Sequence, residues 1–168
     1  MKSALPRARF PLVACLLMLL PAGQTAAQTE SFAQYTQGWN LAGGPLGTDL
    51  SSAQALFSYD GSHYVVPPSQ QTDLCTGYWA YYNAVPTVLL ATWKGGDSQT
   101  CALRAGWTIV GNPFDAPAAL PQKAIAMHWN PLDSTWHQVH KMAPGGAAFV
   151  YSPAPGSITL TAQPTGVR

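Results

Sequence analysis

The sequence predicts an all-β fold, a small barrel or sandwich built as a pseudo-twofold pair of internal repeats with two short helical turns. Three observations support this prediction. The stretch Gly-Trp-Asn-Leu-Ala-Gly-Gly-Pro at 38–45 returns as Gly-Trp-Thr-Ile-Val-Gly-Asn-Pro at 106–113. Short runs of β-branched and aromatic residues alternate with turn residues along the chain. Glycine and proline number 15 each while only 9% of residues are charged, a composition typical of a compact β protein with many turns.

The first 27 residues have the features of an export signal. An apolar run at 10–20 follows the positive charges of Lys2, Arg7 and Arg9 and is too short to cross a bilayer. Small residues before Gln28 predict cleavage after Ala27. Cys15 stands in a Leu-Val-Ala-Cys stretch that resembles a lipoprotein signal, but the apolar run continues past it, which disfavours lipidation. We therefore expect a periplasmic or extracellular protein without a membrane span.

The remaining chain suits one domain with its own core. We predict a polar lead-in at 28–37 and a single β domain at 38–168, made of repeat 1 (38–103) and repeat 2 (104–168). Without the signal, five Lys and Arg residues face seven Asp and Glu residues. Such a weakly charged surface lacks the basic patch that nucleic acid or an anionic membrane requires, so neither is expected as a partner.

The elements of the first repeat follow from its pattern. Alternation at 38–43 predicts a strand with Trp39 and Leu41 on one face. Residues 48–55 predict a short helix. Asp60-Gly61 between aromatic runs predicts a hairpin, because Asp-Gly is a strong signal for a tight turn. Further strands are expected at 77–82, at 87–93 and around Cys101.

The second repeat follows the same order. Residues 115–120 predict a second short helix, and 126–129 and 136–139 predict a longer hairpin. In this correspondence Tyr59 matches Trp129 and Tyr64 matches Trp136. Strands at 146–151 and 157–160 answer those at 77–82 and 87–90.

This order of motifs resembles the GWNL-type β repeats of secreted and surface proteins of bacteria. The first copy carries Gly38-Trp39-Asn40-Leu41 and Gly77-Tyr78-Trp79, whereas the second has Thr108 in place of Asn and Ala147-Ala148 in place of Tyr-Trp. The resemblance covers almost the whole chain after the signal. It implies a non-catalytic accessory module and supplies no site residues.

The tryptophan of each motif is expected to be structural. We predict that Trp39 and Trp107 occupy equivalent core positions in the joint between the halves, with Trp79 also in the core. Gly38 and Gly106 would allow a neighbouring strand to approach. Cys75 and Cys101, left after the signal is removed, predict a disulfide in an oxidising compartment.

Aromatic residues outside the core are the remaining functional signal. Exposed rings near hairpin tips can stack on sugars or anchor a protein. The candidate ligand-binding aromatics are Tyr78, Tyr82, Trp93, Trp129 and Trp136.

Few residues of the sequence are candidates for catalysis or for metal binding, and their patterns are weak. His128, His137 and Asp133 share one hairpin with His140 and form a weak candidate zinc site. Ser98 follows Gly96-Asp97 and resembles the nucleophile of GDS-type esterases, although 133–137 has an Asp-x-x-x-His spacing where those enzymes have Asp-x-x-His. No cofactor is expected. We predict a non-catalytic exported module that binds a protein or glycan or serves as a structural envelope component; a small exported hydrolase is the alternative.

Overall fold

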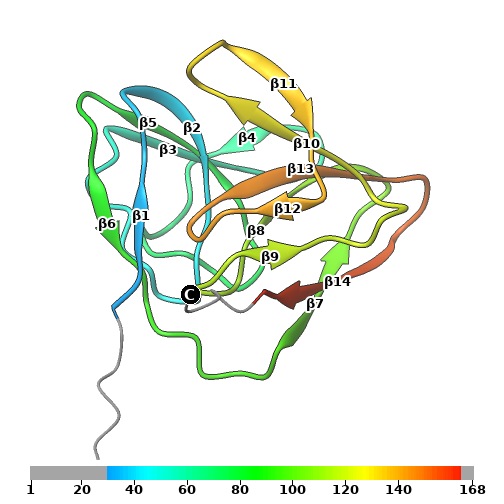
Figure 1. Ribbon diagram of the computed structural model, residues 1–168. Helices are drawn as coiled ribbons and strands as arrows, with labels where there is room; N and C mark the ends of the chain where they lie inside the picture. The colour runs from blue at the N-terminus through cyan, green and yellow to red at the C-terminus, as the bar shows by residue number, and fades with distance from the viewer. Residues whose placement is uncertain (1–29, 164–168) are drawn as a thin grey trace, which may run out of the picture.

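The computed structural model describes residues 30–163, so the predicted signal at 1–27 lies outside the described residues. The described residues form fourteen strands in four antiparallel sheets, and none of these sheets closes into a barrel (Figure 1). The all-β prediction is therefore confirmed. The same residues contain no helix, and hence none that could cross a bilayer.

The first half of the domain contains a four-stranded and a two-stranded sheet. The larger sheet has the order β2 (Gly38–Ala42), β5 (Tyr78–Tyr82), β3 (Ala55–Tyr59), β4 (Tyr64–Val65). The smaller sheet pairs β1 (Phe32–Gln34) with β6 (Thr87–Leu89). Residues 32–34 were expected in a lead-in; instead they form a strand, because Ala33 packs into the core and the backbone pairs with β6.

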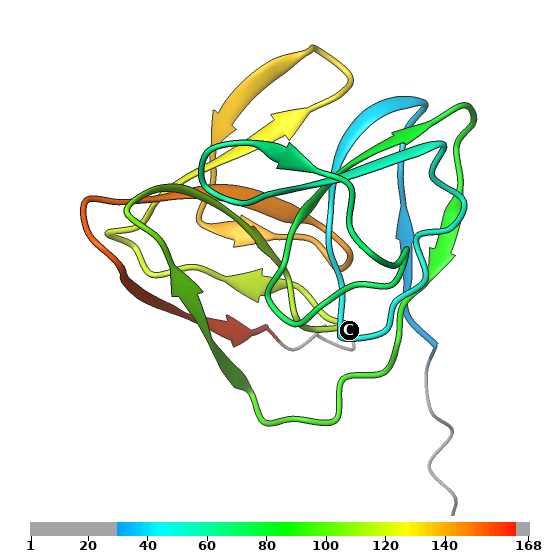
Figure 2. The ribbon, with the colours of Figure 1, turned by 180° about the vertical axis from the view of Figure 1, so that it is seen from behind.

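The second half contains two four-stranded sheets. One has the order β11 (Thr135–Gln138), β10 (Ile125–Asn130), β13 (Ala147–Ser152), β8 (Gly106–Gly111). The other has the order β12 (Lys141–Met142), β9 (Ala118–Ala119), β14 (Gly156–Ala162), β7 (Ser98–Leu103). Figure 2 shows the long connection from β6 to β7 running from the first half to the second.

The two halves use corresponding strands in the same order. The sequence of strands β2-β5-β3-β4 is matched by β8-β13-β10-β11, and the pair β1-β6 is matched by β7-β14. Strand β7 was assigned to repeat 1 from the sequence, but its ladder with β14 places it in the second half. Superposition of the halves about a twofold axis stays a prediction.

The two predicted helices are wrong, because both segments pair with neighbouring chain. The amide of Thr48 donates to the Thr72 hydroxyl at 3.0 Å, and the amide of Leu50 donates to the Gln70 carbonyl at 2.8 Å. In the second half, β9 lies within the predicted helix at 115–120 and bonds to both β12 and β14. Segments this short gain more from such bonds than from an isolated helical turn.

Each half buries a core of its own. In β5 the side chains of Tyr78, Ala80 and Tyr82 point inward and pack with Leu50 and Leu56. The second core is larger. It includes Val110, Phe114, Ala126, Val150, Ile158 and Leu160. The expectation that the halves bury apolar surface only against each other is therefore wrong.

The joint between the halves is small and lies at the C-terminal ends of β2 and β8. Leu41, Ile109 and Ala147 form its buried cluster. The amide of Gly43 donates to the Gly145 carbonyl at 2.7 Å. A Cβ on Gly43 would lie 2.8 Å from the Cα of Gly111, so the two backbones meet without side chains between them.

The prediction that Trp39 and Trp107 fill this joint is wrong. Their side chains are 40% and 39% exposed, and Trp79 is only partly buried. Trp39 and Leu41 lie on the same face of β2, but the second half covers only the end of the strand that carries Leu41. Gly38 and Gly106 also differ from expectation, since nothing lies within 4 Å of a Cβ built on either. They are required instead for positive φ angles of 97° and 85°.

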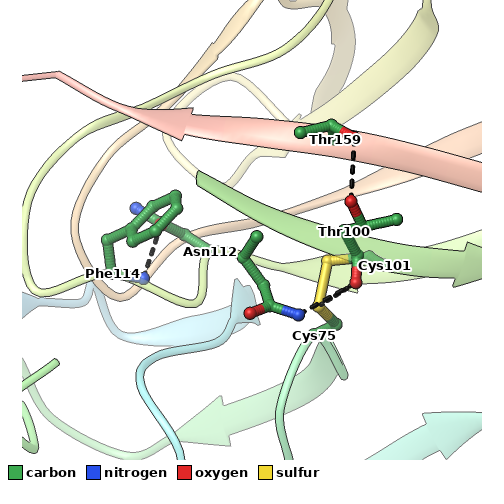
Figure 3. Close-up of a disulfide and its surroundings, with 7 residues drawn as sticks. Cys75, Thr100, Cys101, Asn112, Phe114 and Thr159 are labelled. Carbon is green, nitrogen blue, oxygen red and sulfur yellow. Dashed lines mark hydrogen bonds between the residues drawn. A yellow bond between two sulfur atoms is a disulfide. The ribbon is translucent and has the colours of Figure 1, made fainter. Parts of the chain in front are cut away.

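The disulfide between Cys75 and Cys101 is confirmed, with a Cα–Cα distance of 5.6 Å. It joins the loop before β5 to β7 and so connects the two halves (Figure 3). Beside it, the hydroxyls of Thr100 and Thr159 share a 2.9 Å hydrogen bond between β7 and β14.

Candidate functional site: an aromatic face shared by the two halves

Aromatic rings from the two large sheets gather into one surface, which we call the aromatic face. Neighbouring ring centroids on it lie 5.2–6.5 Å apart. The rings come from eight strands, four in each half. They are Trp39, Phe57, Tyr59, Tyr64, Trp79, Tyr81, Trp107, Trp129, Trp136, Phe149 and Tyr151.

Strand alternation places these rings together. In β5, Trp79 and Tyr81 point to the aromatic face while Tyr78, Ala80 and Tyr82 enter the core. Across the ladders Trp39 lies opposite Tyr81, and Trp107 lies opposite Tyr151. Directly opposed residues on one face of an antiparallel pair are in contact distance, so each half presents a tryptophan–tyrosine pair.

The two hairpins extend the aromatic face. Tyr59 lies opposite Tyr64 in β3–β4, and Trp129 lies opposite Trp136 in β10–β11. Both predicted hairpins are confirmed, while the correspondence of Tyr59 with Trp129 and of Tyr64 with Trp136 stays a prediction. Figure 1 shows the β10–β11 hairpin projecting from the molecule beside β4.

Aspartates hold the turns of these hairpins. The Asp60 carboxylate accepts hydrogen bonds from the amides of His63 at 2.7 Å and Ser62 at 2.8 Å. These donors lower the pKa of Asp60 to about 2. In the second hairpin, hydrogen bonds from the Thr135 hydroxyl and then from His137 lower the pKa of Asp133. The turns, and with them the flanking rings, are thus fixed by local bonds to ionised carboxylates.

Trp79 makes the aromatic face continuous across the joint. Its ring centroid lies 6.0 Å from that of Trp129, 5.9 Å from that of Trp136 and 6.5 Å from that of Phe149. Below these rings lies the buried joint cluster that includes Leu41 and Ile109. The face therefore rests on the buried cluster that the two halves share.

Two pockets open on the aromatic face. The first has a volume of about 460 Å³ and is lined by Trp39, Phe57, Tyr64, Trp79 and Trp129. The second has a volume of about 630 Å³ and is lined by Tyr59, Ser62, Tyr64, Trp107, Met127, Trp136 and Phe149. No carboxylate, lysine, arginine or histidine lines either pocket among the described residues.

The two pockets have corresponding walls. In the first, Trp39 of β2 and Trp79 of β5 stand where the second has Trp107 of β8 and Phe149 of β13. Trp79 lies opposite Leu41 and Phe149 lies opposite Ile109, so the expected match of Trp79 with Ala148 is wrong by one residue. Phe57 pairs with Trp79 across its ladder, and Met127 pairs with Phe149 across the corresponding one. Each pocket also takes a ring from the opposite half: Trp129 closes the first, and Tyr59 lines the second.

The indole nitrogens of the aromatic face are donors without protein acceptors. None of its five indole N–H groups makes a hydrogen bond to another residue within 30–163. By contrast, the indole of Trp93 donates to the Gly96 carbonyl at 2.8 Å. The face therefore combines flat apolar rings with hydrogen-bond donors that have no acceptor among residues 30–163.

Of the five aromatic residues proposed from the sequence, Trp129 and Trp136 lie on the aromatic face. Tyr78 and Tyr82 do not, since they are 0% and 1% exposed. Trp93 lines neither pocket and packs against Phe114 with centroids 5.4 Å apart. The assignments of Tyr78 and Tyr82 as ligand-binding surface are therefore wrong. Trp93 is partly buried and lines a separate pocket of about 530 Å³, so its assignment stays a prediction.

Sequence reasoning also missed several members of the face. They are Trp39, Trp79 and Trp107, which had been assigned to the core, and Tyr64, Tyr81 and Tyr151. Residues 78–82 carry aromatic side chains on both faces of one strand, so periodicity there cannot tell inside from outside. The aromatic pairs of the two hairpins indicated which rings are exposed better than periodicity did.

The candidate metal residues are only partly brought together. His137 lies 3.0 Å from a carboxylate oxygen of Asp133. His128 is opposite His137 in the ladder, but its Nδ1 is 2.8 Å from the Ala147 carbonyl. Within the described part of the chain, no group of three or more His, Cys, Asp or Glu residues could hold a metal ion.

The candidate nucleophile is also isolated. Ser98 begins β7 opposite Thr161 and makes no hydrogen bond to a histidine among residues 30–163. No nucleophile–base pair is therefore assembled around it.

No protein-family model, curated protein or solved structure shows a significant match to this chain.

Proposed function

We propose that this chain is an exported, non-catalytic β module whose aromatic face binds a protein or glycan partner. One observation carries the proposal: rings from both halves form one continuous exposed surface with two pockets. Apolar pockets rimmed by polar groups are the usual form of binding sites in proteins. Large exposed apolar patches are otherwise rare on soluble domains.

The exposure of the rings supports a binding role beyond packing. Tyr64 is 55% exposed and Trp136 is 44% exposed, although both belong to the same cluster as partly buried rings. Each half has a separate core, so the domain does not depend on these exposed rings to bury its apolar strands. A partner that covered them would remove apolar area from water at roughly 25 cal/mol per Å².

A small exported hydrolase remains the alternative function. It would need Ser98 as nucleophile, or His128, His137 and Asp133 as metal ligands. Neither set has a supporting arrangement among residues 30–163, where Ser98 bonds to no histidine and His128 is directed to a backbone carbonyl. The aromatic face has more support because its members do converge.

We also infer that the two halves are repeats related by a pseudo-twofold axis through the joint. Support comes from paired contacts. Ala42 bridges to Gly146 and Val110 bridges to Thr76, which are corresponding positions in the two repeats. Superposition of residues 38–90 on 106–160 in an experimental structure tests this inference, and failure to superimpose would contradict it.

The binding proposal is tested with the full chain expressed for export, purified after processing, and applied to peptide and glycan arrays. We expect binding that is lost in the double variant Trp39→Ala/Trp107→Ala and kept in Phe32→Ala. Phe32 is a suitable control because it is 52% exposed and lies on β1, away from both pockets. No ligand on either array, or equal binding by all three proteins, would reject the proposal.

Mass spectrometry of the same preparation tests export. We expect the processed protein to begin at Gln28. A protein that retains its first 27 residues in the cytoplasm would contradict the predicted location.

A further inference from the structure

We propose that the partner is a proline-rich segment in the polyproline II conformation, bound along the aromatic face. This inference rests on the proposed binding function and names the chemistry of its ligand. Proline-rich segments dock in aromatic-lined grooves because their extended helix is preformed and loses little entropy on binding. The lining of the face, its hydrogen-bonding groups and its two pockets each support this ligand.

The hydrogen-bonding character of the aromatic face suits a ligand rich in acceptors. Its five indole N–H groups have no acceptor within the described residues 30–163, and an indole nitrogen donates but does not accept. A polyproline II segment has backbone carbonyls that point to solvent, and each proline lacks an N–H. Indole donors and proline carbonyls therefore complement each other.

The arrangement of the rings disfavours a glycan. Trp79 is inclined by 66° to Trp129 and by 81° to Trp136, so the rings form walls of pockets and no coplanar platform for a sugar chain. Ser62 is the only polar aliphatic residue lining either pocket. Sugar hydroxyls donate as well as accept, whereas the indoles of these pockets only donate, and the other polar groups on the walls are the hydroxyls of Ser62, Tyr59 and Tyr64. Buried sugar hydroxyls would therefore lack acceptors, whereas proline rings carry no hydroxyl groups.

The absence of charge in both pockets indicates a neutral ligand contact. No acidic or basic side chain lines either one, and the carboxylates of Asp60 and Asp133 are already bonded within their own turns. We therefore expect affinity to change little between low and moderate salt.

Two corresponding pockets on one continuous surface favour a ligand that reaches both. A segment long enough to occupy the two pockets binds the second one intramolecularly, at a high effective concentration. Affinity should then rise more steeply with peptide length than the added contacts of a single pocket explain.

The test is calorimetric titration of the processed protein with deca-L-proline, penta-L-proline, a ten-residue Gly-Ser peptide, cellohexaose and chitohexaose. We expect deca-L-proline to bind at least about tenfold more tightly than penta-L-proline, and the Gly-Ser peptide and both sugars not to bind. Unchanged deca-L-proline affinity between 50 and 300 mM salt, to within about twofold, supports the neutral contact.

Matched variants locate the ligand. Trp39→Ala and Trp107→Ala alter different pockets, and each should weaken deca-L-proline binding by about tenfold. Trp107→Phe keeps an aromatic ring but removes the N–H donor, so it should weaken binding by about threefold. Phe32→Ala should bind like the wild type, and thermal melts confirm that every variant is folded.

The outcomes separate this inference from the binding function. Binding of either sugar without deca-L-proline would overturn the proline-rich ligand and leave the binding function intact. Binding of deca-L-proline that is unaffected by both tryptophan variants would also overturn it. Failure of every probe here, together with failure of both arrays, would remove the binding function itself.

Discussion

The loops that enter β5 and β13 meet the same backbone requirement with different residues. Cys75 and Gly145 have φ angles of 64° and 74°, and their carbonyls accept bonds from Gly111 at 3.1 Å and Gly43 at 2.7 Å. Glycine adopts this left-handed conformation freely, whereas a residue with a Cβ is strained in it. The first half tolerates the strain at the position of its disulfide. The contact between the halves therefore requires a positive φ angle in each loop. The first half meets this requirement with Cys75 and the second half with Gly145.

The largest effect should come from the glycines at which the two backbones meet. A Cβ on Gly111 would collide with the Thr76 carbonyl oxygen, and one on Gly43 would lie 2.7 Å from the Gly146 carbonyl oxygen. Each Gly→Ala change should destabilise the fold by about 3 kcal/mol or more, because backbone on both sides has to move. Urea unfolding measures the loss. Gly96→Ala is the control, since nothing lies within 4 Å of its Cβ. Wild-type stability in both joint variants would show that the halves do not meet closely there.

Removal of the disulfide should have the next largest effect. The loop between Cys75 and Cys101 spans 26 residues, so the double variant Cys75→Ala/Cys101→Ala should lose about 3 kcal/mol of stability. Cys75→Gly/Cys101→Ala should recover about 1 kcal/mol of it, because glycine relieves the positive φ. Urea unfolding of both double variants tests this. Equal stability would mean that Cys75 and Gly145 do not meet the same conformational requirement.

Asn40 and Thr108 occupy corresponding positions but make different numbers of bonds. Asn40 Nδ2 donates to the carbonyls of Thr36 at 2.9 Å and Gly38 at 3.0 Å, and its Oδ1 accepts from the Thr36 amide at 3.1 Å. Thr108 only accepts from the Arg104 amide, at 3.2 Å.

We therefore expect Asn40→Ala to cost about 2 kcal/mol, since it leaves partly buried backbone groups of Thr36 and Gly38 without partners. Thr108→Ala should cost about 0.5–1 kcal/mol, because it removes one partly exposed bond. Thermal or urea unfolding of the two variants compares them directly. A larger loss of stability for Thr108→Ala than for Asn40→Ala would contradict this ranking of the two side chains.

The smallest effect should be the pH dependence of the first hairpin. The folded-state pKa of Asp60 is lowered from 3.8 to about 2, because the His63 and Ser62 amides favour the ionised carboxylate. The resulting stabilisation is present above the unfolded value of 3.8 and is lost as pH falls through about 2.

NMR titration of the Asp60 carboxyl measures this pKa. In Asp60→Asn the acid-dependent change in the stability of the hairpin between pH 4 and pH 2 should be reduced. An Asp60 that titrates near 3.8 would show that the turn bonds do not hold the ionised form.

The position of each main strand could be predicted from the sequence, because strand signals are local. Aromatic and β-branched runs bounded by Gly, Pro and Asp marked β3, β5, β10 and β13, and Asp60-Gly61 marked the first turn. Strand β1 was missed because three residues between polar neighbours carry little periodicity. The helices at 48–55 and 115–120 were expected for local reasons and were replaced by bonds to distant segments such as Thr72.

The candidate site was harder to predict, because burial depends on what the other half covers. Trp39 and Leu41 share one strand face, yet Leu41 is 2% exposed while Trp39 is on the surface. Their sequence pattern is the same as that of a uniformly buried strand face. Only contact with Ile109 and Ala147 distinguishes the two residues.

By itself the sequence determined the all-β class, the positions of the main strands and of the two hairpins, and the disulfide partners, all of which depend on neighbouring residues or on cysteine number. Tertiary structure decided which rings are exposed, where the halves touch, and that Trp39, Trp79, Trp129 and Trp136 form one surface. The physical reason is that side-chain alternation gives each strand two faces. Which face meets water is set by the packing of segments about 70 residues apart, and local patterns do not record it.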